Sequence, residues 1–147
     1  MKKLKPILIV FGILLAIALF LYYRAHPLAT QIEIRGHKFT VDLAVTNREK
    51  ERGLGYRDSL APDHGMLFVY DHPEQYTFWM KGMRFPLDMI WIENKTVVDI
   101  SRNVPVSVNG TLPTYSPRLP VSQILEVNAG VADQLGIQIG DEVRILK

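Results

Sequence analysis

Residues 65–93 read GMLFVYDHPEQYTFWMKGMRFPLDMIWIE, and this stretch decides the fold class of the 147-residue chain. It holds both tryptophans and four of the five methionines. Apolar runs at residues 66–70, 76–80 and 87–92 are separated by turn-forming segments, a pattern that predicts three successive β-strands. Because strict alternation of apolar and polar residues fails in all three runs, both faces of these strands should be covered. The stretch is therefore predicted to form the centre of a β-rich fold.

The segments on either side extend this pattern. Further strands are predicted at residues 31–34, 39–45, 97–104, 123–127 and 142–146, the first two joined by a turn at Gly36-His37. Short helices are predicted after Thr46, which forms a capping-box pattern with Glu49, and over residues 131–135. Residues 105–120 contain four prolines and no apolar period, which predicts a long loop. About eight strands and two short helices indicate a mainly β domain, a compact sandwich or barrel.

The N-terminus differs in composition from the rest of the chain. Three lysines precede residues 6–23, an uncharged and largely apolar run that would make a helix of about 27 Å. A cleaved signal peptide and a retained transmembrane anchor are the two interpretations. We favour the anchor, because the run ends in bulky FLYY rather than in small residues. The lysines predict a cytoplasmic N-terminus, with residues 1–30 as anchor and tether and residues 31–147 as an extracytoplasmic domain on the inner membrane.

Net charge argues against a nucleic-acid partner. The chain has 17 Lys+Arg and 15 Asp+Glu, and removing the three N-terminal lysines leaves 14 basic and 15 acidic side chains, a net charge of −1. Nucleic-acid binding needs a clustered basic face, which this balance does not provide. The chain contains no cysteine, which excludes disulfides and thiolate metal sites, and its histidines form no metal-binding motif. We therefore expect neither a bound metal nor another cofactor.

Several short motifs occur in order along the chain. They are Glu51-Arg52-Gly53-Leu54, Gly65-Met66-Leu67-Phe68-Val69, Phe78-Trp79-Met80-Lys81, Pro86-Leu87-Asp88-Met89-Ile90, Tyr115 with nearby prolines, Leu125-Glu126-Val127-Asn128-Ala129-Gly130 and Gly136-Ile137 followed by Gly140-Asp141. Together they resemble the uncharacterised prokaryotic family known as domain of unknown function 192. The resemblance implies a compact, mainly β domain of sandwich type, often exported or membrane-tethered, and it implies no established activity. The chain departs from the family pattern at Gly55, where Met is common, and at Gly82-Met83, where Asn-Thr is usual.

Six residues are candidates for a binding site: Trp79, Lys81, Arg84, Asp88, Tyr115 and Glu126. Asp88 enters an apolar strand face and so needs a partner, and Lys81 or Arg84 lies close enough in the sequence. We expect a structural ion pair there, the alternative being a general acid-base or ligand-anchoring role. Trp79 should pack in the core, unless its face is uncovered and free to stack on a ligand.

Three classes of function remain open. The favoured one is a non-catalytic, membrane-tethered domain that binds a small molecule or an extended ligand. The alternative is a small hydrolase or lyase that uses Asp88 with Lys81 or Glu126, whose carboxyls would flank a cleft if residues 123–127 and 87–92 formed neighbouring strands. The third is an interaction module for a protein partner at the membrane. An apolar groove, two convergent carboxylates or a flat apolar patch would distinguish the three.

Overall fold

The computed structural model describes residues 11–17, 30–107 and 110–146 of the chain. Residues 11–17 form a helix. Within these ranges, no helix is both long and apolar enough to cross a membrane. Most of the predicted anchor at residues 6–23 lies outside the described residues, as do residues 24–29 of the predicted tether.

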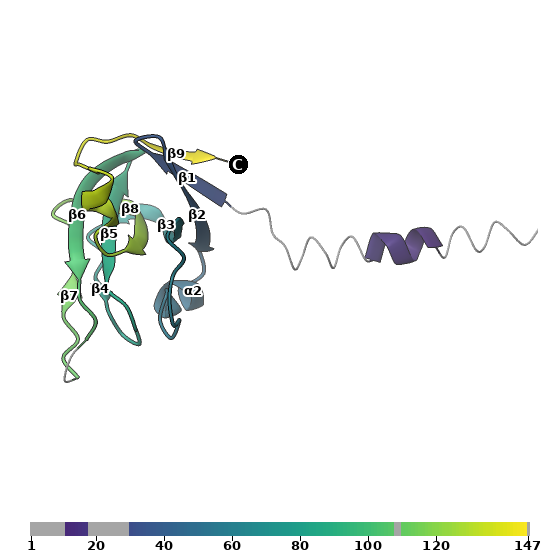
Figure 1. The fold of residues 1–147 in the computed structure, drawn as a ribbon, viewed down its shortest axis with the longest axis horizontal. Coiled ribbons are helices and arrows are strands. Elements are labelled where there is room, and N and C mark those ends of the chain that lie inside the picture. Colours follow the sequence, from purple (N-terminus) through teal and green to yellow (C-terminus); the bar gives the residue numbers. More distant parts are fainter. Residues whose placement is uncertain (1–10, 18–29, 108–109, 147) are drawn as a thin grey trace, which may run out of the picture.

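The β domain contains nine strands and two short helices in the part of the chain that is described (Figure 1). The strands are β1 (Thr30–Ile34), β2 (His37–Ala44), β3 (His64–Glu74), β4 (Phe78–Trp79), β5 (Leu87–Glu93), β6 (Thr96–Val104), β7 (Thr114–Tyr115), β8 (Val121–Asn128) and β9 (Val143–Leu146), and the helices are α2 (Asn47–Arg52) and α3 (Val131–Gln134). Seven strands form one sheet in the order β6-β5-β8-β3-β2-β1-β9, and β4 pairs with β7 in a separate ribbon. The β2–β3 pair is parallel, since the segment containing α2 crosses over between these strands.

Two tight hairpins depend on left-handed backbone conformations. Arg35 and Gly36 join β1 to β2 with φ of 53° and 80°, and Asn94 and Lys95 join β5 to β6 with φ of 49° and 60°. Positive φ at both central residues matches the twist of antiparallel strands. The first turn therefore comprises Arg35-Gly36 rather than the predicted Gly36-His37, and His37 begins β2.

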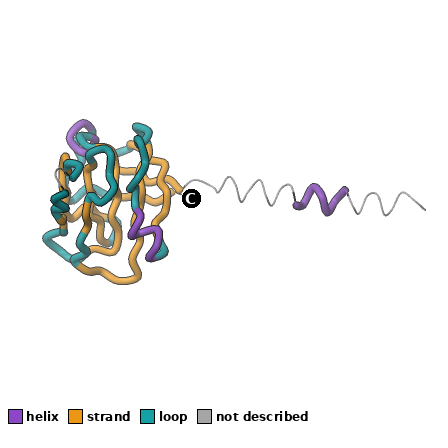
Figure 2. Tube along the Cα trace, turned by 90° about the horizontal axis from the view of Figure 1, so that it is seen from below, coloured by secondary structure: helices purple, strands orange, loops and turns teal. Residues whose placement is uncertain are grey.

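The seven-stranded sheet curls into a half-barrel (Figures 1 and 2). One apolar cluster takes side chains from all seven strands, including Ile32, Phe39, Leu67, Ile90, Val97, Leu125 and Val143. A single cluster can collect residues from every strand only if the sheet wraps around it. At one end the two edge strands meet, because the Val143 N–H donates to the Lys95 oxygen at 2.8 Å and Thr96 forms a bridge with Glu142. The prediction of a mainly β, barrel-like domain is confirmed in this form.

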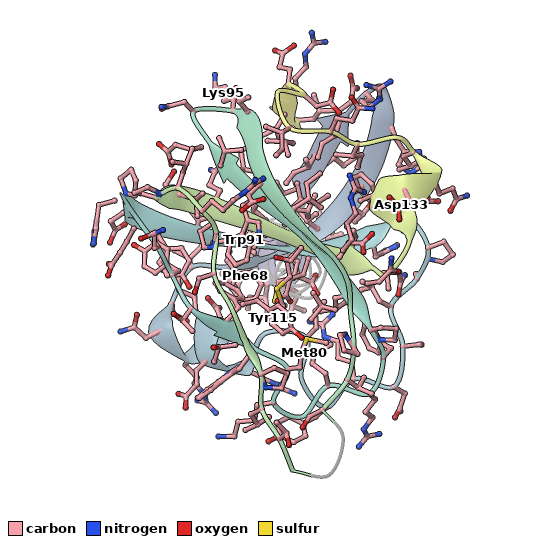
Figure 3. The ribbon with its side chains drawn as sticks, turned by 90° about the vertical axis from the view of Figure 1, so that its left-hand side faces the viewer. Phe68, Met80, Trp91, Lys95, Tyr115 and Asp133 are labelled. Atoms are coloured by element: carbon pink, nitrogen blue, oxygen red, sulfur yellow. The ribbon has the colours of Figure 1, made fainter. Side chains whose placement is uncertain are left out.

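A second apolar cluster, which we call the outer cluster, covers the other face of the sheet. Phe68 of β3 and Trp91 of β5 pack edge-on against Phe78 of β4, with ring centroids 4.9 and 5.5 Å away. Figure 3 shows Phe68, Met80, Trp91 and Tyr115 gathered on this side. Because β5 lies between the two clusters, six of its seven residues are buried. The prediction of cover on both faces is therefore confirmed for β5, whereas β4 leaves Trp79 on an exposed face.

Some elements differ in extent from their predictions. The strand predicted at residues 76–80 is reduced to β4, which pairs only with β7. The long loop predicted at residues 105–120 contains β7, whose two residues are too few to give a sequence signal. Strand β3 continues to Glu74 across an irregularity that follows Val69.

Candidate functional site

A pocket of about 60 Å³ lies where α2, β3, β4 and β8 meet on the outer face of the sheet. Its lining includes Lys50, Tyr70, Trp79, Lys81 and Glu126. The structure therefore brings three of the six candidates from the sequence, Trp79, Lys81 and Glu126, to one place. We refer to it as the Glu126 pocket.

Helix α2 supplies one wall of the pocket, and the predicted capping box fixes its start. The Glu49 N–H donates to Thr46 Oγ1 at 3.3 Å, and the Thr46 N–H donates to Glu49 Oε2 at 2.8 Å. Gly53 ends the helix with φ of 50° and donates its N–H to the Glu49 oxygen. Lys50, in the last turn, reaches β3, where its Nζ lies 4.1 Å from the centroid of the Tyr70 ring.

Two glycines allow the segment after α2 to approach the loop after β4. A Cβ on Gly55 would lie only 3.1 Å from the Lys81 oxygen. A Cβ on Gly82 would lie 2.9 Å from the Tyr56 ring, and the Tyr56 N–H donates to the Gly82 oxygen at 2.8 Å. Gly55 and Gly82 both belong to this one contact. The contact sets Lys81 beside α2.

Glu126 is the buried ionisable group of the pocket. Its residue is 4% exposed, and its register partners are Met66 on β3 and Met89 on β5. Among the residues that the structure describes, none hydrogen-bonds to the carboxyl, and burial raises the pKa of Glu126 to about 8. No fully buried polar side-chain atom in the described ranges lacks a partner, so the carboxyl oxygens must reach the pocket surface. At neutral pH the carboxyl is mostly protonated, and it can donate a hydrogen bond into the pocket.

Two ammonium groups lie over aromatic rings at the same place. Lys81 Nζ is 5.1 Å from the centroid of the Trp79 ring, a contact comparable to that of Lys50 with Tyr70. Burial raises the pKa of Tyr70 to about 12, with smaller contributions from the Tyr76 and Glu126 charges. Tyr70 therefore remains a neutral phenol, and the pocket lining combines a protonated Glu126 carboxyl with two ammonium groups.

The prediction that Trp79 packs in the core is wrong, since Trp79 is 45% exposed. Successive residues of a strand point to opposite faces, and in β4 Phe78 points to the outer cluster, which turns Trp79 away from it. Trp91 takes the core position and donates from Nε1 to Ser101 Oγ at 3.0 Å. Both tryptophans follow apolar residues, so local sequence did not separate their environments. Trp79 is instead an exposed aromatic side chain that lines the pocket.

Asp88 does not share the pocket with Glu126, although β5 and β8 are neighbours as the enzymatic hypothesis requires. The register pairs Asp88 with Val127 and Met89 with Glu126. Because neighbouring residues of a strand point to opposite faces, the two carboxyls lie on opposite sides of the sheet. They therefore do not flank one cleft, and a mechanism that uses Asp88 with Glu126, or with Lys81 in the same pocket, is contradicted.

Asp88 has backbone partners rather than the predicted ion pair. Its Oδ1 accepts from the Asn103 N–H at 2.7 Å, and its Oδ2 accepts from the Ala132 N–H at 2.8 Å. The prediction of an ion pair with Lys81 or Arg84 is wrong, because the fold carries Asp88 away from the loop that holds these two. The structural role expected for Asp88 is retained: it bridges an irregularity of the β5–β6 pair to α3, whose N-cap residue makes no side-chain cap bond.

The two remaining candidates lie outside the lining of the pocket. Arg84 forms an exposed ion pair with Asp58. Tyr115 pairs with Phe78 in the β4–β7 ribbon and packs against the outer cluster. In the described ranges there is also no group of three or more His, Cys, Asp or Glu side chains that could hold a metal ion.

Sequence reasoning missed Lys50 and Tyr70 as pocket residues. Lys50 belongs to the predicted helix, but nothing near it in the sequence says which strand that helix packs on. Tyr70 carried a weak signal, because it alternates with Met66 and Phe68 on one face of the strand. The signal identified the face but not the long-range contact.

Comparisons with known proteins agree with the resemblance seen in the sequence. A family model described as DUF192, "Uncharacterized ACR", matches residues 30–145. No curated protein matches the chain. The predicted family resemblance is therefore confirmed, and it covers every described residue of the pocket.

Solved structures show the same fold. A protein of Sinorhizobium meliloti 1021, described as a "putative transcription regulator", is 35% identical with a TM-score of 0.73, over 80% of this chain and 94% of that one. A protein of unknown function from Novosphingobium aromaticivorans DSM 12444 is 32% identical with a TM-score of 0.70, over 81% of this chain and 89% of that one. Neither description names a ligand.

Proposed function

The chain belongs to the DUF192 family, and we propose that its β domain is a non-catalytic binding module whose ligand site is the Glu126 pocket. The observation that carries the proposal is the Glu126 carboxyl itself, buried, without a hydrogen-bond donor among the described residues, and reaching the pocket. Burial of a carboxyl without a partner costs folding free energy. Ionisable groups held in such settings concentrate at functional sites.

The rest of the pocket has the composition of a small-molecule site. Trp79 and Tyr70 offer aromatic faces, Thr77 offers a hydroxyl, and Lys50 and Lys81 offer positive charge. A few convergent polar groups among apolar ones are usual for such sites. With a volume of about 60 Å³, the pocket suits a very small ligand or one end of a longer one.

Two other functions are less well supported. A hydrolase or lyase would need acid and base groups that converge, whereas Asp88 lies on the opposite face of the sheet from Glu126. The Sinorhizobium relative is described as a "putative transcription regulator". Nucleic-acid binding by this chain would need a basic face, whereas residues 24–147 carry a net charge of −1.

We further propose that the N-terminal anchor is retained in the mature protein and that the β domain lies outside the inner membrane. Support comes from the uncharged run at residues 6–23 and the three lysines before it. Intact mass of the membrane-extracted protein tests retention, and protease added to intact spheroplasts tests the side. A mature chain that begins near Gln31, or a domain protected from protease, would contradict this part of the proposal.

Ligand-observed NMR of the full chain with mixtures of small metabolites tests the binding function. We expect at least one compound to bind the parent chain and the Lys38→Ala control, which changes an exposed lysine outside the pocket lining. The same compound should not bind a Trp79→Ala/Glu126→Leu double variant that remains folded. If every bound compound binds the double variant equally, the Glu126 pocket is not the ligand site.

A further inference from the structure

We propose that the Glu126 pocket takes the carboxylate group of a small organic acid, with the Glu126 carboxyl donating a hydrogen bond and the Lys50 and Lys81 ammonium groups supplying positive charge. This inference rests on the proposed binding function and names the chemical class of its ligand. It follows from the charges that line the pocket, from the protonation of Glu126 and from the size of the pocket.

The charged groups that line the pocket together with Glu126 are predominantly positive. Helix α2 contributes Lys50, Glu51 and Arg52, and the loop after β4 contributes Lys81. Strand β3 contributes the neutral phenol of Tyr70, and Met89, the partner of Glu126 on β5, carries no charge. With Glu126 protonated, three cations stand against one anion, so an anionic ligand is favoured over a cationic one.

Lys50 and Lys81 are placed at the pocket rather than merely near it. Each ammonium group lies over the face of an aromatic ring that also lines the pocket, Tyr70 at 4.1 Å and Trp79 at 5.1 Å from the ring centroids. Ring faces attract these cations and limit their freedom, so the charge lies where a ligand would enter.

Protonation of Glu126 then selects the ligand. Burial raises its pKa to about 8, so at neutral pH the carboxyl carries the proton that a carboxylate ligand lacks. A hydrogen bond from O–H to a carboxylate oxygen is short and charge-assisted, and it is among the stronger hydrogen bonds of proteins. A neutral amide would accept a weaker hydrogen bond, and an organic cation would be repelled by the positive charges of Lys50 and Lys81.

The size of the pocket favours a small head group. Its volume is about 60 Å³. A planar carboxylate is less bulky than a tetrahedral phosphate or sulfate. The rest of the organic acid would extend out of the pocket past Trp79, whose exposed ring offers a surface for it.

The proposal makes affinity depend on pH in one direction. Binding requires Glu126 to hold its proton, because two carboxylates in contact repel one another. Affinity is therefore level at pH values below the pKa of Glu126, as long as the ligand is ionised, and falls about tenfold for each pH unit above it.

Carbon-13 NMR of labelled acetate titrated into the full chain over the millimolar range provides the test. Acetamide and methylammonium serve as neutral and cationic probes of similar size. We expect acetate to bind most tightly at pH 6.5, and more than about tenfold more weakly at pH 9.5. Glu126→Gln keeps a donor but cannot ionise, so it should retain acetate binding and lose the pH dependence. Lys81→Met should weaken acetate binding at both pH values, whereas Lys38→Met should not.

The outcomes separate failure of the ligand class from failure of the binding function. If methylammonium or acetamide binds the pocket more tightly than acetate, or if acetate affinity does not fall between pH 6.5 and 9.5, carboxylate recognition is wrong and the pocket still binds a ligand. If the acetate affinity of Glu126→Gln falls between pH 6.5 and 9.5 as much as that of the parent, the proton is on another group and the inference is likewise wrong. If Trp79→Ala/Glu126→Leu abolishes the binding of none of the three probes, carboxylate recognition is wrong. The metabolite mixtures then test the binding function independently.

Discussion

Asp88 and Glu126 are both buried carboxyls, on neighbouring strands and in consecutive register pairs, but the protein treats them in opposite ways. Asp88 faces the inside of the half-barrel and accepts two backbone N–H groups, at 2.7 and 2.8 Å. Glu126 faces the outer side, where no described residue donates to it and where burial raises its pKa to about 8. A shift of one residue along the sheet therefore separates a carboxylate that stabilises the fold from a carboxyl that the fold tolerates. Burial alone therefore does not distinguish a structural carboxyl from a functional one, whereas the hydrogen-bond partners of the carboxyl do.

The strongest test of this contrast is Asp88→Ala. It leaves the N–H groups of Asn103 and Ala132 without their acceptors, and hydrogen bonds to a charged group contribute about 1.5–3 kcal/mol each. We expect the free energy of unfolding to fall by about 3–4 kcal/mol, measured by urea denaturation at pH 7. The control is Asp133→Ala on α3, which removes an exposed ion-pair partner of Arg102 and should cost less than about 1 kcal/mol. A loss for Asp88→Ala no greater than that of the control would show that Asp88 is not structural.

Glu126→Gln should have the opposite effect on stability. The pKa of Glu126 is raised in the folded state, so the unfolded state binds fewer protons between the ordinary pKa near 4.5 and about 8. Stability of the parent therefore falls as pH rises through this window. The Gln variant lacks this decline, and it should gain stability over the parent between pH 5 and pH 8 in denaturation series. Glu51→Gln, an exposed change at the same pocket, should leave the decline intact, and parallel pH profiles for the parent and Glu126→Gln would contradict the assignment.

A third carboxyl, Asp99, sharpens the contrast because its partners include a charged side chain as well as backbone N–H groups. Burial acts to raise the pKa of Asp99, but hydrogen bonds from Arg118 and from the Ile100 N–H hold it below its ordinary value. Stability from this pair is present above the ordinary pKa of Asp and is lost as pH falls through the lowered pKa. Arg118→Gln should therefore lower the melting temperature at pH 7 and have little effect near pH 2. A difference that persists undiminished at low pH would mean that Arg118 acts through packing.

The smallest expected effect is that of deleting residues 1–29. Asp88, Asp99 and Glu126 and all their described partners lie within residues 30–146, the range that the family match spans almost completely. The truncated domain should be soluble, give a β-rich circular dichroism spectrum, and reproduce the urea midpoints of the full chain and of its Asp88 and Glu126 variants. A truncation that unfolds or aggregates would show that the N-terminal segment contributes to the domain.

The sequence predicted the central strands, both helices and the capping box of α2, because these depend on residues close together in the chain. It also indicated that Asp88 needs a partner, since a carboxylate on an apolar strand face cannot remain alone. It could not identify that partner, because the N–H groups of Asn103 and Ala132 reach Asp88 only through the pairing of β5 with β6 and the position of α3. For the same reason the pocket was predicted only in part: Lys81 and Trp79 are adjacent to the central strands, whereas Lys50 joins them through packing of α2 on β3.

The double coverage of β5 has a consequence for the unfolded chain. Residues 89–92, Met-Ile-Trp-Ile, form an uncharged run without proline and with high β-propensity, the composition of segments that aggregate when exposed. Asp88 and Glu93 stand at its two ends, and charged residues in such places hinder the stacking of identical strands. Asp88 therefore protects the protein in two states, as a hydrogen-bond acceptor in the native sheet and as a flanking charge in the denatured chain. Variants at this position are expected to precipitate on heating rather than refold on cooling.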